Sequence, residues 1–439
     1  MEITLDLVEK LNKEITDDSS IRLAMNAASR VELQDLAINR DLVKSIDFSF
    51  SDEVEVAPEA TAQQRVGVCW AFAAMNLMRF ITQKKINVKS FEYSGPYLMF
   101  WDKFEKANYF LDKVVEFRDL PYDDRNLQSF LGNPIPDGGD WYMFVNLVKK
   151  YGMVPASVKQ HSAYSKDSTK HNEVLSSKLR QCAAIIRQMH KEGKTIEEIQ
   201  QKREEFVHEI YRILVISFGT PPSKFDWSYK NEDKKFFREK NITPKEFFDK
   251  YVGINLDDYA CLWTSPMNDT PYYKTFSIGH TRKMVGGDRQ LALNIPFDEF
   301  KKYAVQMLKD HEPCLFSCDV GRDSLRKEGL LVKDLYNFDL VFHTDVRVPR
   351  EVRLEIGDTH MTHCMLIVGI DIDEDKVIKW KVENSWGTDV GKKGFFVMSD
   401  DWFDDNVYQI IVPKKYLDNE KLELLKQEPT VLPLWHPMF

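Results

Sequence analysis

Apolar residues recur at helical spacing in the first half of the chain. From Trp70 to Lys85 they follow steps of three and four residues, and no Gly or Pro interrupts them, which predicts a long, well-buried helix. The same spacing predicts helices over 97–111 and over 141–151, the second of which ends at Gly152. This half of the chain is therefore expected to be built mainly from packed helices.

Residues 172–218 have the pattern of two antiparallel helices. The break lies at Gly193, and Thr195 with Glu198 forms a capping-box pattern for the second helix. Apolar side chains then follow that helix as a stripe, formed by Ile196, Ile199, Phe206, Ile210, Ile213 and Leu214. Such spacing is more typical of a packed helix face than of a cofactor site, so we interpret the hairpin as architecture.

The last third of the chain has strand signals instead. Short apolar runs separated by turns predict strands over 314–320, 364–370, 377–382 and 395–398. Helices followed by strands are typical of an α+β protein, in which a helical half packs against a sheet half. A cleft between two such halves is a natural place for an active site.

These patterns divide the chain into five segments. The first, residues 1–60, is an N-terminal arm with a short Ala-rich helix predicted within 20–36, and an extended, acidic linker is predicted over 50–62. The others are the helical half with the candidate nucleophile, a helical insertion, the sheet half and a C-terminal tail, over 61–165, 166–285, 286–420 and 421–439.

Composition restricts the functional class. The net charge of −9 argues against a nucleic-acid partner, because nucleic-acid binding requires clustered positive charge. No apolar run approaches the roughly 18–20 residues of a membrane helix, and the N-terminus lacks the pattern of a secretory signal. Six cysteines in 439 residues do not form a disulfide framework. We therefore expect a cytoplasmic protein with reduced thiols and no membrane partner.

Cys69 is the candidate nucleophile. It lies at the start of the long apolar helix, where the helix dipole and unpaired N–H groups stabilise a thiolate. Gly67 permits a tight turn just before it. Gln63, six residues upstream, is positioned to add an amide N–H to the backbone N–H of Cys69 and bind a developing oxyanion; its neighbour Gln64 carries the same amide.

A cysteine nucleophile needs a base, and the base needs a group that orients it. His363 directly precedes the strand over 364–370, and Asn384 follows the next strand. Adjacent strands bring the two side chains together, so that Asn384 accepts from the imidazole and fixes its tautomer. Trp386 is placed to shield this hydrogen bond from water.

Metal binding is the alternative chemistry for these residue types. His311, Cys314 and Cys318 have a compatible spacing, and so do His360 and His363 with the nearby Asp358 and Cys364. No paired Cys-x-x-Cys motif supports either set, and Cys314 and Cys318 fall on one face of a predicted strand. We therefore expect no metal and no cofactor.

The ordered motifs resemble the papain superfamily of cysteine peptidases, and most closely its branch of bleomycin hydrolase and bacterial aminopeptidase C. The resemblance extends from about residue 20 to the C-terminus. It rests on Gln63, on the Gly-x-Cys-Trp motif at 67–70, and on the stretches 69–74, 100–103, 107–110, 137–139, 361–363 and 380–387.

The resemblance implies a papain-like two-part fold, with a helical half and a β-barrel-like sheet half. It implies that Cys69 is the nucleophile, His363 the base, Asn384 the orienting residue and Gln63 an oxyanion donor. Peptides would then be hydrolysed through a thioester acyl-enzyme. We also expect four residues to contact substrate: Gly138, Gly139, Trp386 and Phe439.

The family also implies a homohexameric ring with active sites facing an internal channel. In such a ring the chain's own C-terminal tail lies in the cleft, near the active site, and its carboxylate meets the free amine of the peptide substrate, which makes the enzyme an aminopeptidase. A non-catalytic ring that binds peptides or nucleic acid is the alternative of another class, and the intact set of Gln, Cys, His and Asn argues against it.

The tail departs from the family pattern. Family tails read Leu-Pro-x-Trp-Asp-Pro-Met-Gly and continue with a few small residues, whereas this one has His436 in place of Asp and stops at the bulky Phe439. A shorter tail withdraws the carboxylate from the cleft. An endopeptidase or oligopeptidase is therefore the alternative expectation.

Overall fold

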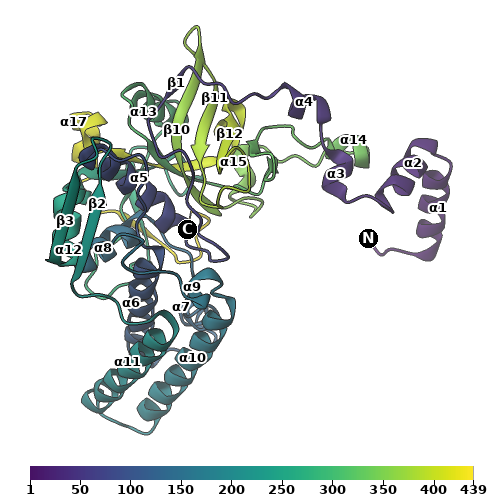
Figure 1. The fold of residues 1–439 in the computed structure, drawn as a ribbon. Helices are drawn as coiled ribbons and strands as arrows, with labels where there is room; N and C mark the ends of the chain where they lie inside the picture. Colours follow the sequence, from purple (N-terminus) through teal and green to yellow (C-terminus); the bar gives the residue numbers. More distant parts are fainter. Residues whose placement is uncertain (439) are drawn as a thin grey trace.

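A twelve-stranded mixed sheet and a set of long helices form the two halves of the molecule in the computed structural model, which describes residues 1–438 (Figure 1). The strand order is β14-β5-β6-β4-β13-β7-β10-β11-β12-β9-β8, with β1 paired to β10. A second sheet contains only β2 and β3. The α+β organisation expected from the sequence is confirmed.

The strands of the large sheet come mostly from the second half of the chain. In chain order, the strands are β1 Asp52–Glu53, β2 Phe225–Lys230, β3 Phe236–Ile242, β4 Tyr259–Trp263, β5 Lys274–Ile278, β6 Ala292–Asn294, β7 Cys314–Cys318, β8 Ser324–Leu325, β9 Leu330–Leu331, β10 His363–Asp373, β11 Lys376–Glu383, β12 Phe395–Ser399, β13 Val407–Pro413 and β14 Thr430–Leu432.

The helices come from both halves of the chain. They are α1 Leu5–Thr16, α2 Ser19–Ala28, α3 Leu33–Ala37, α4 Arg40–Ser45, α5 Cys69–Ile86, α6 Gly95–Glu116, α7 Arg125–Gly132, α8 Trp141–Tyr151, α9 Ala163–Lys166, α10 Thr169–Lys191, α11 Ile196–Phe218, α12 Pro244–Tyr251, α13 Phe297–Lys309, α14 Phe338–Phe342, α15 Arg350–Arg353, α16 Asp400–Asn406 and α17 Asn419–Leu424. None of the helices in the described part of the chain is both long and apolar enough to span a membrane.

Helix α5 is the centre of the helical half. Its residues are buried on nearly every side, from Trp70 to Met78 without a break, and it packs against β10 and β7 of the sheet as well as against α8. Burial of a helix all round is typical of the interior of a large domain. Its first residue is therefore held at the boundary between the two halves.

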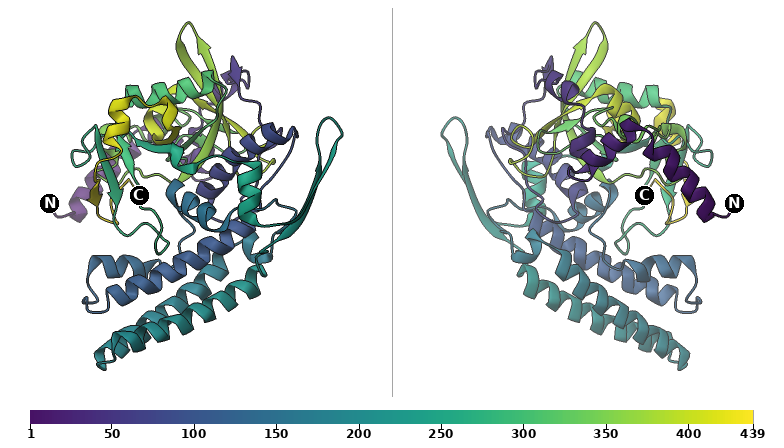
Figure 2. Two further views of the ribbon diagram at one scale, coloured as in Figure 1. Left: turned by 90° about the vertical axis from the view of Figure 1, so that its left-hand side faces the viewer. Right: turned by 90° about the vertical axis from the view of Figure 1, so that its right-hand side faces the viewer.

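The predicted helices are confirmed in this half. Helix α8 has the predicted bounds, and Gly152 ends it with a φ of +69°, a backbone conformation that glycine adopts without strain. The hairpin of α10 and α11 turns at Gly193, and Thr195 and Glu198 form the capping box. Figure 2 shows this hairpin lying beside α6 and extending away from the sheet.

The prediction of a helical insertion over 166–285 is wrong beyond Phe218. Strands β2 and β3 form an antiparallel hairpin that protrudes from the body (Figure 2), and β4 and β5 belong to the large sheet. The physical reason is visible in β2, where Phe225, Trp227 and Tyr229 alternate with polar residues at the period of a strand.

The N-terminal arm contains more helix than the sequence pattern indicates. The short Ala-rich helix predicted within 20–36 is α2, whereas α1, α3 and α4 were not predicted. In α1 the apolar residues Leu5, Val8, Leu11 and Ile15 do recur at helical spacing, a local signal that the prediction missed, whereas α3 and α4 have only five and six residues. The arm extends from the body, with α1 and α2 farthest from the sheet (Figure 1). The linker over 50–62 contains β1, which pairs with β10, and Ala62 at its end forms a β-bridge with Trp386.

Candidate active site

Cys69 is the first residue of α5 and lines a cavity of about 350 Å³ between the two halves. Its backbone N–H belongs to the first turn of the helix, where N–H groups have no partner within the helix, and the helix dipole adds positive potential there. The cavity is lined by Gly67, Cys69, Trp70, Ser129, Asn133, Pro136, Gly138, Gly139, Asp140, Lys283, Gln290, Ser317, Met361, Thr362, His363, Cys364, Gln409, Leu434 and Met438.

His363 and Asn384 are joined by a hydrogen bond of 2.8 Å between Nε2 and Oδ1. The backbone N–H of Ser385 donates to the same Asn384 oxygen at 2.7 Å. Because a backbone N–H is only a donor, the shared atom is the carbonyl oxygen, and His363 Nε2 must carry a hydrogen. The imidazole therefore keeps Nδ1 as the nitrogen that gains or loses a proton, in the orientation that the sequence predicts.

Trp386 covers this hydrogen-bonded pair. Its ring centre lies 4.8 Å from that of His363, with the two planes tilted by 32°, and the Arg326 guanidinium lies 4.4 Å from the centre of the Trp386 ring. The indole thus limits the access of water to the imidazole. Trp386 does not line the Cys69 cavity, so its expected contact with substrate stays a prediction.

The pKa of the Cys69 thiol is held well below its ordinary value. The largest cause is a hydrogen bond with the Cys364 side chain, which lowers the pKa. Burial acts in the opposite direction, and the charge and the hydrogen bond of His363 lower the pKa further. A lowered pKa favours the thiolate, which is the nucleophilic form. A thiolate, an oriented imidazole and an amide acceptor together can carry out nucleophilic acyl transfer.

Gln63 is fixed close to the same residues. Its Nε2 donates to the carbonyl of Val66 at 2.7 Å, and its Oε1 accepts from Ser385 Oγ at 2.6 Å. One amide hydrogen is thereby used. Gln63 does not line the Cys69 cavity, so its expected role as an oxyanion donor stays a prediction. Gln64, by contrast, is exposed and lines another cavity. Ser385, which orients the amide, was not among the predicted site residues.

The two glycines differ in what surrounds them. A Cβ on Gly139 would meet the Trp70 ring at 2.5 Å, so the close packing of the indole against the backbone excludes any side chain there. A Cβ on Gly138 would meet nothing within 4 Å, and this residue faces open space beside the cavity. Close approach of another backbone is thus possible at Gly138.

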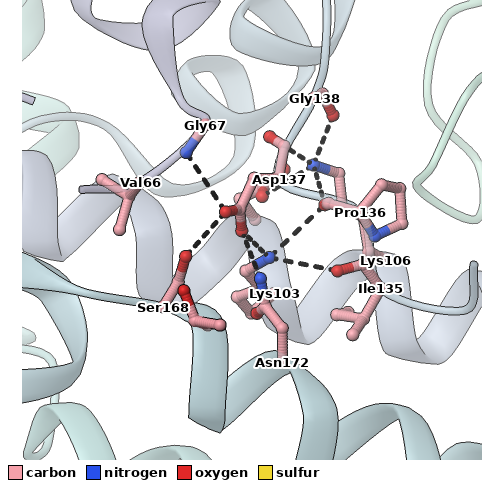
Figure 3. Close-up of polar contacts among 12 residues, drawn as sticks. Val66, Gly67, Lys103, Lys106, Ile135, Pro136, Asp137, Gly138, Ser168 and Asn172 are labelled. Atoms are coloured by element: carbon pink, nitrogen blue, oxygen red, sulfur yellow. Dashed lines mark hydrogen bonds and ion pairs between the residues drawn. The ribbon is translucent and has the colours of Figure 1, made fainter. Parts of the chain in front are cut away.

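Asp137, which directly precedes Gly138 and Gly139, connects this segment to the loop before Cys69 (Figure 3). Its carboxylate accepts from the N–H of Gly67 at 3.1 Å, from Lys103 at 2.5 Å, and from two residues at the start of the helical hairpin, Ser168 at 2.6 Å and Asn172 at 2.8 Å. The Asp137 side chain therefore connects its own segment, next to Gly138 and Gly139, with the loop before Cys69, with α6 and with α10.

Two buried lysines of α6 complete this network. Lys106 Nζ donates to the carbonyls of Pro136 and Gly138 at 3.0 and 2.8 Å and pairs with Asp102 at 2.8 Å. Burial acts to raise the pKa of Asp137, but the Lys103 ammonium and the hydrogen bonds hold it well below its usual range. The Asp137 carboxylate is therefore ionised in the folded protein, and its charge opposes the effect of burial, which lowers the pKa of Lys103.

The cavity contains residues that were not predicted to act on substrate, and Cys364 among them was considered only as a metal ligand. Ser317, Cys364 and Gln409 come from β7, β10 and β13, and burial lowers the pKa of Lys283, another lining residue, to about 8. From the tail, Leu434 and Met438 reach the cavity. Phe439, predicted to contact substrate, lies outside the described residues.

The metal alternative gains no support from the positions of its residues. Within residues 1–438, no three or more His, Cys, Asp or Glu side chains are grouped as metal ligands. Cys314 and Cys318 are buried in β7, whereas His311 is exposed after α13. His360 is exposed and His363 is engaged by Asn384.

Comparison with known proteins gives full-length matches. The model of the peptidase C1-like family matches residues 2–439. Aminopeptidase C of Streptococcus thermophilus is 37% identical over 443 residues, which covers 99% of this chain and 98% of the relative. Bleomycin hydrolase of Mus musculus is 36% identical over 441 residues, which covers 98% and 96%.

A solved structure extends the likeness to three dimensions. The crystal structure of pepw from Lactobacillus rhamnosis superposes with a TM-score of 0.97 at 38% identity, over 100% of this chain and 98% of that one. The papain-like α+β fold and the branch inferred from the ordered motifs are confirmed.

Proposed function

The chain belongs to the peptidase C1-like family, and from that premise we propose that it is a cysteine aminopeptidase that removes residues from the free N-terminus of peptides. The observation that carries the proposal is the set formed by Cys69, His363 and Asn384, with the Asn384 oxygen fixing the imidazole at 2.8 Å. The names of the full-length relatives, aminopeptidase C and bleomycin hydrolase, support the same class.

The reaction proceeds by acyl transfer. The Cys69 thiolate adds to the carbonyl carbon of the peptide bond, and the oxyanion meets the backbone N–H of Cys69 and the free amide hydrogen of Gln63. His363 gives its Nδ1 proton to the departing amine, which leaves a thioester on Cys69. Water, losing a proton to His363, hydrolyses this thioester and restores the thiolate.

The tail supports removal of terminal residues rather than internal cleavage. Leu434 and Met438 line the same cavity as Cys69, and Met438 is fully buried. His436 anchors the tail, because Nε2 lies 3.2 Å from Asp269 Oδ2 and Nδ1 accepts from the N–H of Met438 at 3.2 Å. A tail held in this way shortens the cleft on one side of the nucleophile.

The test uses two fluorogenic peptides that differ only in an acetyl group on the N-terminus. We expect the free-amine peptide to be cleaved and the acetylated peptide to be cleaved at least about 100-fold more slowly, a difference of about 2.7 kcal/mol in transition-state binding. The Cys69→Ala variant supplies the background rate. Equal kcat/KM for both peptides would identify an endopeptidase and overturn the aminopeptidase proposal.

The assembly belongs to the same proposal: the active form is a cytoplasmic homohexamer. Apolar side chains lie exposed on the arm, where Leu5, Val8, Leu11 and Ile15 follow one face of α1, and Leu23 of α2 is 71% exposed. Apolar faces of this kind mark protein–protein contacts. The six cysteines are unpaired, as expected for a reducing compartment.

Light scattering after size-exclusion chromatography tests the hexamer. We expect a mass of about six times the 51.4 kDa of one chain, and a smaller species for the Leu11→Glu variant, because burying that charge in an apolar contact is costly. Glu14→Gln, on the same helix but on a polar position, is the matched control and should leave the mass unchanged. A monomeric wild-type protein would contradict the proposal.

A further inference from the structure

Cys364 lies in the wall of the active-site cavity, directly after His363. It is paired with Ser317 across β10 and β7, is half-buried, and lines the cavity together with Cys69. Its sulfur lies 3.2 Å from Ser317 Oγ. The Cys364 side chain is also the largest of the influences that shift the pKa of the Cys69 thiol, which it lowers.

A chain of buried hydrogen bonds fixes the direction in which Ser317 donates. Trp263 Nε1, which is only a donor, gives its hydrogen to Gln409 Oε1 at 2.9 Å. This places Gln409 Nε2 toward Ser317 Oγ at 3.0 Å, as a donor. The Ser317 hydroxyl oxygen thus accepts, and its hydrogen is directed to the remaining partner in residues 1–438, the sulfur of Cys364.

A sulfur that accepts from Ser317 keeps its own hydrogen for another group. The sulfur of Cys69 faces the same cavity, and it is the better acceptor as a thiolate. We propose that Cys364 is a positioning residue: its S–H donates to the Cys69 thiolate, at the end of a relay that starts at Trp263 and passes through Gln409 and Ser317. The proposal rests on the proposed function in that it takes Cys69 as the nucleophile.

The pKa shifts of Cys364 and Cys69 agree with Cys364 as the donor of this hydrogen bond. The hydrogen bond to Cys69 and burial raise the pKa of Cys364 well above its ordinary value, whereas the pKa of Cys69 is lowered. Cys364 therefore stays a thiol at the pH at which Cys69 is a thiolate. An alanine at 364 would preserve the strand but leave the thiolate one donor short.

The experiment measures the rate of Cys69 alkylation by iodoacetamide against pH, with the modified residue identified by peptide mass spectrometry. For Cys364→Ala we expect the midpoint to rise by about one pH unit, so that alkylation at low pH slows about tenfold, while the rate at high pH is unchanged. Cys364→Ser retains a donor and should return the midpoint toward the wild-type value. Cys314→Ala, a buried thiol of β7 outside the relay, is the matched control.

An unchanged midpoint in Cys364→Ala overturns the proposal, and so does an equal shift in Cys364→Ala and Cys364→Ser. If Cys364→Ala does not fold, Ser317→Ala breaks the relay one step earlier and should raise the midpoint by less. Alkylation needs no peptidase activity. A wild-type protein that is inactive on peptides but shows the shift would overturn the proposed function alone, and an active protein without the shift would overturn the role of Cys364 alone.

Discussion

Replacing Cys69 by alanine is expected to lower kcat/KM for a free-amine peptide by about 10⁵-fold or more, which is the scale seen when a nucleophile that acts with a base is removed. The variant keeps the helix, because alanine is a good helix former, so loss of activity should occur without loss of fold. Steady-state kinetics on the fluorogenic peptide give the ratio. Cys182→Ala removes a buried thiol of α10 and is the matched control that should keep its activity.

The base gives a sharper form of this test. His363→Ala should lose activity to a similar degree, and the double variant Cys69→Ala with His363→Ala should lose hardly more than either alone, because the two groups act as a unit. Losses that multiply in the double variant would contradict the proposed mechanism. The folded state of each variant is checked by circular dichroism.

Replacing Asp137 by alanine is expected to have the largest effect on stability. The change leaves the Lys103 ammonium, which is fully buried, without its counter-ion, and breaking a buried ion pair in this way costs about 3–5 kcal/mol. The urea midpoint of unfolding should fall accordingly, and activity with it, because Gly67 loses its acceptor. Glu173→Gln breaks an exposed pair with Lys170 and should cost less than about 1 kcal/mol.

Removing both charges should be milder than removing one. Asp137→Ala with Lys103→Met leaves no unpaired buried charge, so part of the lost stability should return. A double variant less stable than Asp137→Ala would refute the view that the unpaired ammonium causes the loss.

The same carboxylate gives a dependence on pH. Its pKa is depressed in the folded protein, so its contribution to stability is fully present above the unfolded value of about 3.9 and is lost as the pH falls from there toward the lower folded value. Urea midpoints measured from pH 6 down to pH 3 should therefore fall less steeply in Asp137→Asn than in the wild type. Identical slopes would contradict the charged pair.

The sequence predicts elements whose signal is local. Helix α8 and the capping box at Thr195 are determined by neighbouring residues, and their bounds agree with the structure. Strands such as β14 depend instead on contacts with distant residues. Thr430–Leu432 pairs in parallel with Phe276–Ile278, and nothing near residue 430 indicates such a partner.

The residues of the candidate site also differ in whether the sequence near them predicts their role. Cys69, His363 and Asn384 lie in ordered motifs, and adjacent strands allow their meeting to be predicted. Cys364 directly follows His363 in the sequence, but its neighbours Ser317 and Gln409 come from strands that only the sheet order brings together. The role of Asp137 was hidden because its partners lie up to 70 residues away.

The contacts of Asp137 with Ser168 and Asn172 have a consequence for engineering. The hairpin of α10 and α11 looks like a module that could be excised or exchanged, since it extends from the body as a separate pair of helices (Figure 2). Its first turn, however, supplies two of the donors that hold the loop before Cys69. A shortened enzyme would have to retain residues 168–172, or provide equivalent donors, to keep a working nucleophile.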